Sequence, residues 1–206
     1  DTDSAIDHYL KVGGPQAIRA RVQAARLLYQ QGNAGQAHAL MQDLAQQQPE
    51  LQDSLIITEA EMRSSNGDPQ GAIALINDAL RDQPDNTELL YSRAMTAEKV
   101  GDLAQLEKDL KRIITLNPDD ASALNALGYT LGNRTDRLDE AYQYVSRALE
   151  LRPDDPAILD SMGWVLYQRG EPEAARDYLR QAYEKFPDPE VAAHYGEVLW
   201  VLGAQN

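Results

Sequence analysis

The side chains that most often do chemistry in proteins are few in this sequence and widely spaced. Its histidines are His8, His38 and His194, and the chain has no cysteine. A catalytic nucleophile needs a base beside it and a third group that orients the base. No histidine has an acidic partner at a convincing spacing, so we interpret all three as surface or packing residues. The lack of cysteine also excludes disulfides and thiolate metal sites.

Paired acids are the next candidates for chemistry. Asp119 and Asp120, and likewise Asp154 and Asp155, directly follow a proline. A calcium loop would need more oxygen ligands at alternating positions. Acids before a helix can instead cap its free N–H groups and interact favourably with its dipole. We therefore predict helix caps here and no metal site.

The known catalytic motifs are missing. There is no phosphate-cradling glycine loop, no His-Glu-x-x-His and no Gly-x-Ser-x-Gly. We expect a protein that is not an enzyme and that uses no cofactor and no metal.

The charge balance restricts the partners. The net charge is −14 and the sequence pI is about 4.5. A groove that follows a phosphate backbone needs surplus Lys and Arg, so nucleic acid is excluded as a partner, and adhesion to anionic lipid is disfavoured. No apolar run approaches the roughly 20 residues that span a bilayer. We expect no membrane insertion by this segment and look for protein partners.

Prolines and glycines reveal an internal period. Five prolines are spaced 35, 34, 35 and 34 residues apart: Pro49, Pro84, Pro118, Pro153 and Pro187. Four glycines lie 17 residues before a proline of this series: Gly32, Gly67, Gly101 and Gly170. Proline stops a helix, and glycine tolerates the positive φ of a helix C-terminus. Each repeat is therefore predicted to be helix, glycine turn, helix, proline.

Small residues recur at fixed positions between these glycines and prolines. One phase of the first helix holds Ala25, Ala60, Ala94, Gly128 and Gly163. Matching phases of the second helix hold Ala37, Ala72, Ala141 and Ala175, and also Ala79, Ala148 and Ala182. Small side chains let two antiparallel helices cross closely. The alternative, an alanine-rich bundle without repeats, does not explain agreement at several phases.

Two repeats depart from the pattern. In the third, Leu106 and Ile113 stand where alanine is expected, and Arg93 replaces an apolar residue. The fourth loses its turn glycine and gains one residue near Thr135. We expect the helices of the third repeat to cross less closely.

A 34-residue helix–turn–helix repeat with this pattern resembles the tetratricopeptide repeat. The resemblance implies an all-α solenoid, a right-handed superhelix of antiparallel helix pairs. We predict one array over 1–206, and expect it to be part of a longer one. Its complete repeats are 18–52, 53–86, 87–120, 121–155 and 156–188; 1–17 is predicted to hold the second helix of a truncated repeat, and 189–206 the first helix of a further one.

In such solenoids the first helices line a concave groove that binds proteins or peptides. The groove positions hold both tryptophans and several tyrosines, side chains that anchor interfaces. Packing between repeats is the other possible role of these side chains. We predict a protein-binding groove formed by Tyr91, Asn125, Tyr129, Asp160, Trp164, Tyr167 and Trp200. Only Asn125 matches the Lys and Asn pattern that grips chaperone tails, so we do not expect that ligand.

Residues 123–129 (ALNALGY), 158–167 (ILDSMGWVLY) and 192–200 (AAHYGEVLW) resemble bacterial tetratricopeptide lipoproteins, above all the outer-membrane type that binds a carboxyl-terminal processing protease. The resemblance implies a periplasmic adaptor, lipid-anchored outside this segment, that holds a PDZ-type serine protease and its substrates, often cell-wall hydrolases. One alternative is an assembly scaffold of an envelope secretion or pilus machine. Another is the regulatory repeat region of a larger enzyme.

Overall fold

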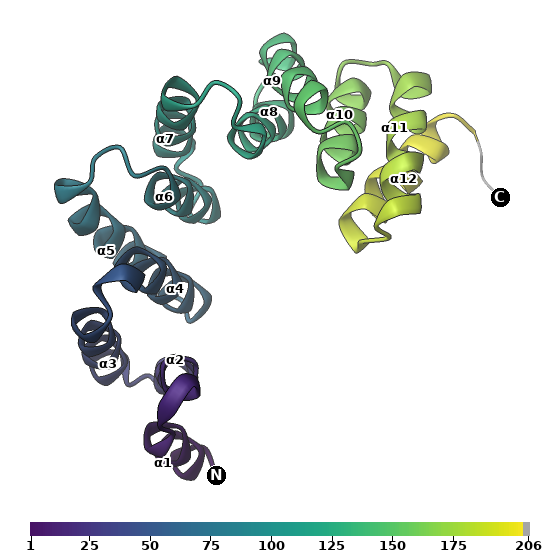
Figure 1. Ribbon diagram of the computed structural model, residues 1–206. Coiled ribbons are helices and arrows are strands. Elements are labelled where there is room, and N and C mark those ends of the chain that lie inside the picture. The colour runs from purple at the N-terminus through teal and green to yellow at the C-terminus, as the bar shows by residue number, and fades with distance from the viewer. Residues whose placement is uncertain (204–206) are drawn as a thin grey trace. The chain divides into compact units, whose positions relative to one another are not determined.

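The computed structural model describes residues 1–203, and every regular element in that range is helical (Figure 1). The all-α fold class is therefore confirmed. Short 3-10 turns, Gly14–Gln16 and Pro49–Leu51, precede two of the helices. The α-helices are α1 (Thr2–Lys11), α2 (Ala17–Gln30), α3 (Ala34–Gln47), α4 (Gln52–Ser65), α5 (Pro69–Asp82), α6 (Thr87–Lys99), α7 (Leu103–Leu116), α8 (Ala121–Arg134), α9 (Leu138–Leu151), α10 (Pro156–Gln168), α11 (Pro172–Lys185) and α12 (Pro189–Val201).

The turn residues behave as their spacing predicts. Gly32 has φ 79° and Gly170 has φ 82°, the left-handed region that side chains with a Cβ rarely adopt. Helices α3 and α11 each end two residues before a proline of the periodic series, at Gln47 and Lys185. In the fourth repeat, which lacks the glycine, α8 ends at Arg134 and the chain turns through an extended Thr135.

The two acids of each pair have different hydrogen-bond partners. Asp120 accepts a hydrogen bond from the N–H of Ala123 at 2.9 Å, and Asp155 accepts one from Ala157 at 3.0 Å. They are the N-caps of α8 and α10, as predicted. The preceding acid of each pair instead bonds a basic residue of the following second helix: Asp119 with Arg147 at 2.6 Å and Asp154 with Lys185 at 2.9 Å.

Small residues lie at the helix crossings. Ala25, Ala60 and Ala94 are fully buried. A Cβ added to Gly128 would lie 2.5 Å from Cγ2 of Val145 and 2.9 Å from the carbonyl oxygen of Ala141 on α9. The two helices therefore pack so closely at Gly128 that even a methyl group has no room.

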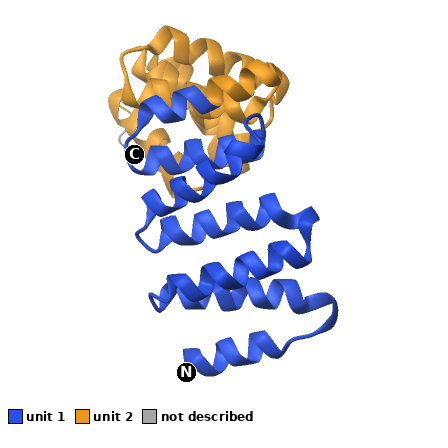
Figure 2. Cartoon of the chain, turned by 90° about the vertical axis from the view of Figure 1, so that its left-hand side faces the viewer, with its two compact units in different colours: residues 1–109 blue, residues 110–206 orange. Residues whose placement is uncertain are grey.

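The chain forms two compact units, residues 1–109 and 110–206 (Figure 2). Within unit 1, helices α1 to α6 contact one another in chain order. Within unit 2, α8 to α12 do the same. In both units each first helix also contacts the next first helix: α2 with α4 and α4 with α6 in unit 1, and α8 with α10 and α10 with α12 in unit 2. Three first helices of unit 2 are thus neighbours in space although their residues lie far apart in the chain.

Arg93, which departs from the repeat pattern, has a buried partner in unit 1. Its Nε and Nη2 donate to the two carboxylate oxygens of Asp109 at 2.8 and 2.6 Å. Asp109 is 1% exposed and also accepts a hydrogen bond from Gln105 at 2.9 Å. Arg93 Nη1 donates to Asn77 at 2.6 Å. Arg93 therefore neutralises a carboxylate whose burial without a positive partner would destabilise the fold.

Candidate protein-binding face of unit 2

The first helices of unit 2 form one face with α10 in the middle. The hydroxyl of Tyr129 on α8 donates to Oε1 of Glu190 on α12 at 2.6 Å, across 61 residues of sequence. The hydroxyl of Tyr167 on α10 donates to Oε1 of Glu197 on α12 at 3.0 Å. Tyrosines of two repeats are therefore held in place by glutamates of a third.

A cluster of rings fills the space between these helices. Trp164 on α10 stacks on His194 of α12, with ring centroids 4.1 Å apart and an interplanar angle of 20°. Tyr167 lies 5.3 Å from Trp164, and Tyr129 lies 6.2 Å from His194, both in tilted contacts. The structure therefore brings together Tyr129, Trp164 and Tyr167. It adds His194, which the sequence alone does not connect with them.

His194 also has an acidic partner. Its Nδ1 lies 3.1 Å from both carboxylate oxygens of Asp160, and both residues are buried. His38 likewise pairs with Glu59 at 2.8 Å in unit 1. The interpretation that no histidine has a convincing acidic partner is therefore wrong for these two. Their acids belong to neighbouring repeats, 34 and 21 residues away in sequence, so spacing within one helix could not reveal them.

Exposure divides the predicted groove residues into two classes. Asp160 is 7% and Trp164 8% exposed, and the indole N–H donates to Asn133 at 3.2 Å. Both side chains pack between repeats, and their contact with a partner stays a prediction. Tyr129 and Tyr167 are half-buried, whereas Trp200 is 67% exposed. We call Tyr129, Tyr167 and Trp200, with Glu190 and Glu197, the aromatic face.

The aromatic face is acidic. Within residues 1–203, Glu190 and Glu197 form no ion pair with a basic residue, and each accepts a tyrosine hydroxyl. The hydrogen bond to Glu197, more than burial, raises the pKa of Tyr167. Trp200 follows Glu197 by three residues, so it lies on the same side of α12. A large exposed ring thus lies one helical turn from the carboxylate of Glu197.

Asn125 and Tyr91 are the two remaining predicted residues. Asn125 on α8 is half-buried, and its Oδ1 is enclosed with no hydrogen-bond donor among the described residues. Tyr91 lies on α6 in unit 1, half-buried, and is described with that unit alone.

Other kinds of site are not found over residues 1–203. This range holds no group of three or more His, Cys, Asp or Glu side chains able to bind a metal ion. None of its helices is long and apolar enough to cross a membrane.

A family model described as "Tetratricopeptide repeat" matches residues 119–188, which span α8 to α11. Residues 119–188 carry tetratricopeptide repeats. A curated relative, the TPR repeat-containing protein PA4667 of Pseudomonas aeruginosa, is 46% identical over 198 residues. That match covers 96% of this chain but only 34% of the relative, so the chain spans about a third of its length.

Solved structures of tetratricopeptide repeat proteins share the fold. One from Parabacteroides merdae has a TM-score of 0.69 at 16% identity, covering 91% of this chain and 74% of the other. TTC0263 of Thermus thermophilus has a TM-score of 0.64 at 21% identity, covering 73% and 83%. YrrB, described as a TPR protein with an unusual peptide-binding site, has a TM-score of 0.60 at 20% identity, covering 95% and 97%. The predicted solenoid of helix pairs is confirmed, and repeats of this kind imply a scaffold for protein–protein interaction.

Proposed function

We propose that this chain is an adaptor that holds a partner protein against the aromatic face of unit 2. The observation that carries the proposal is the 67% exposed ring of Trp200 on α12, the helix whose Glu190 and Glu197 also accept hydrogen bonds from the hydroxyls of two tyrosines. Fixed aromatic side chains bind with little loss of conformational entropy, and they are frequent among the residues that dominate interface energies.

The chemistry of this face defines the partner segment. Two carboxylates without a basic counterpart repel acidic peptides and attract Lys or Arg. A cation beside an aromatic ring is further stabilised by the quadrupole of the ring. We expect a partner segment with basic and apolar side chains.

As the finer form of the proposal, the partner is a carboxyl-terminal processing protease, and the adaptor works at the periplasmic side of the outer membrane. Support comes from the resemblance of residues 121–203 to the lipoproteins that bind such proteases. The repeats would bring protease and substrate together and raise their effective concentration, while the protease supplies the nucleophile.

The test is a binding titration of the purified chain with a purified carboxyl-terminal processing protease from the same organism. The double variant Tyr167→Ala with Trp200→Ala should weaken binding at least tenfold, about 1.4 kcal/mol. The control Tyr183→Ala removes a 41% exposed tyrosine from α11, a second helix, and should leave affinity within about twofold.

Two results would count against the proposal in different ways. If the protease does not bind at all, the finer form is refuted. If it binds and the control weakens affinity as much as the double variant, the partner uses another surface, and the aromatic face is not the site.

A further inference from the structure

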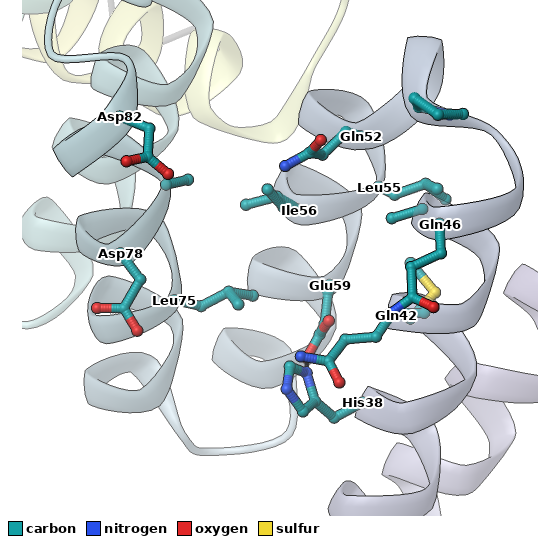
Figure 3. A pocket seen from close by; sticks show the side chains of 14 residues that line it. His38, Gln42, Gln46, Gln52, Leu55, Ile56, Glu59, Leu75, Asp78 and Asp82 are labelled. Carbon is teal, nitrogen blue, oxygen red and sulfur yellow. Dashed lines mark hydrogen bonds and ion pairs between the residues drawn. The ribbon is translucent and has the colours of Figure 1, made fainter.

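Unit 1 holds a pocket on the side of its second helices. The pocket has a volume of about 450 Å³ and lies between α3, α4 and α5 (Figure 3). Its apolar lining comprises Met41, Ala45, Leu55, Ile56, Leu75 and Ala79. A pocket of this size is within the range that binds ligands in proteins.

The pocket and the predicted groove use opposite sides of α4. Leu55, Ile56 and Glu59 line the pocket. Ile57 and Glu61 of α4 occupy the repeat positions that Tyr91 and Trp164 occupy on their own helices, so they belong to the predicted groove. They lie on average roughly 170° away around the axis at about 100° per residue. The pocket is therefore a separate surface from the one that first helices use.

A buried acid forms one end of the pocket. Glu59 is 3% exposed and lines the cavity next to His38, as Figure 3 shows. Its Oε1 accepts hydrogen bonds from Tyr29 Oη at 2.7 Å and Arg63 Nη2 at 2.7 Å, and lies 2.8 Å from His38 Nδ1. All the hydrogen bonds that Glu59 makes with the described residues go to this one oxygen. Arg63 and His38 therefore already satisfy the carboxylate at this end of the pocket.

The rim is negative on one side and amide-rich on the other. Asp78 and Asp82 of α5 face Gln42 and Gln46 of α3 across the opening (Figure 3). Asp78 pairs with Arg81 at 2.6 Å, but the two side chains are 65% and 76% exposed. The attraction within such an exposed ion pair is weak. Asp82 has no basic partner in the described part of the chain. No Lys or Arg is among the residues that line the pocket.

We propose that this pocket binds a short segment of a partner protein in which a large apolar side chain stands next to a Lys or Arg. The apolar side chain would cover Leu55, Ile56 and Leu75. The cation would lie against Asp82 and Asp78, where it finds negative charge with little competition from the chain's own bases. The glutamine amides offer donors and acceptors to the segment's backbone.

This is a second binding surface, independent of the aromatic face. It lies wholly in unit 1, whereas the aromatic face lies wholly in unit 2. The variants that test one surface therefore leave the other unchanged, and failure of one proposal does not decide the other.

The test is selection of a phage-displayed library of random dodecapeptides on the purified chain, with counter-selection on the Asp82→Lys variant. Asp82 is exposed, so this change leaves the fold intact. Selected peptides should combine apolar residues with Lys or Arg. Their affinity, measured by fluorescence polarisation, should fall at least about tenfold in Asp82→Lys.

Matched controls separate the pocket from general attraction to an acidic protein. Asp43→Lys makes the same charge change on an exposed residue of α3 that does not line the pocket, and should alter affinity less than about twofold. Ala79→Leu narrows the pocket and should weaken binding, whereas Ala74→Leu on the exposed side of α5 should not. Thermal melts by circular dichroism verify that each variant is folded.

Several results would overturn the proposal. Recovery of no peptide after counter-selection would show that the pocket binds no such segment, and selected peptides without Lys or Arg would refute the charge argument. Equal weakening by Asp82→Lys and Asp43→Lys would mean that net charge alone attracts them. Loss of binding in the Tyr167→Ala, Trp200→Ala double variant would place the peptides on the aromatic face.

Discussion

Arg93→Leu should destabilise the chain more than its position on a repeat surface would suggest. The change leaves the carboxylate of Asp109, 1% exposed, without its cation and with only the Gln105 amide as a described side-chain donor. Removing one partner of a buried ion pair costs about 3–5 kcal/mol. Because Gln105 remains, we expect the lower end, about 3 kcal/mol. At about 2–4 °C per kcal/mol for a chain of this size, the melting temperature should fall by roughly 6–12 °C.

The double variant Arg93→Leu with Asp109→Leu distinguishes an unpaired charge from lost packing. Two apolar side chains leave no buried charge, so the double variant should recover to within about 1 kcal/mol of the parent or exceed it. As a control, Arg81→Leu breaks an exposed pair with Asp78 and should change stability by less than about 1 kcal/mol. Urea and thermal unfolding followed by circular dichroism measure all four chains. A double variant as unstable as Arg93→Leu would refute the reasoning, as would a single variant that melts with the parent.

Two further changes test the packing of unit 2. Gly128→Ala should lower the free energy of unfolding by about 1–3 kcal/mol because its Cβ would meet Ala141 and Val145. The control Gly196→Ala has nothing within 4 Å of its Cβ, so it should be neutral or stabilise by up to about 1 kcal/mol. Equal melting temperatures for the two variants would contradict the close crossing. Trp164→Ala should lower the free energy of unfolding by about 3–5 kcal/mol, measured by thermal melts, because the ring is 8% exposed and stacks on His194. An unchanged melting temperature would mean that Trp164 is not a packing residue.

The repeat architecture was predictable because it depends on local signals. A glycine such as Gly32 ends a helix through its own backbone freedom, and a capping acid such as Asp120 acts within three residues. Alanines at fixed phases, such as Ala60, indicate helix crossings directly from periodicity. Each of these signals lies within one repeat, which is the length over which a sequence pattern can be recognised.

The site was less predictable because its contacts join different repeats. The pairing of Asp160 with His194 spans 34 residues, and that of Tyr129 with Glu190 spans 61. Helical phase placed Trp164 and Trp200 on the same kind of position, yet one is 8% and the other 67% exposed. Burial at these positions depends on what the next repeat places against each ring, and phase within one helix does not contain that information.

The side-chain bonds between neighbouring repeats have a consequence for how the protein is made. Tyr29 with Glu59, Asp53 with Gln83 and Asp139 with Arg169 each join residues 30 positions apart. A repeat that leaves the ribosome therefore finds its partners within the last few tens of residues already synthesised. Short separations favour rapid folding, and solenoids can grow from one repeat to the next. We expect this chain to fold progressively during translation, with each repeat serving as the template for its successor.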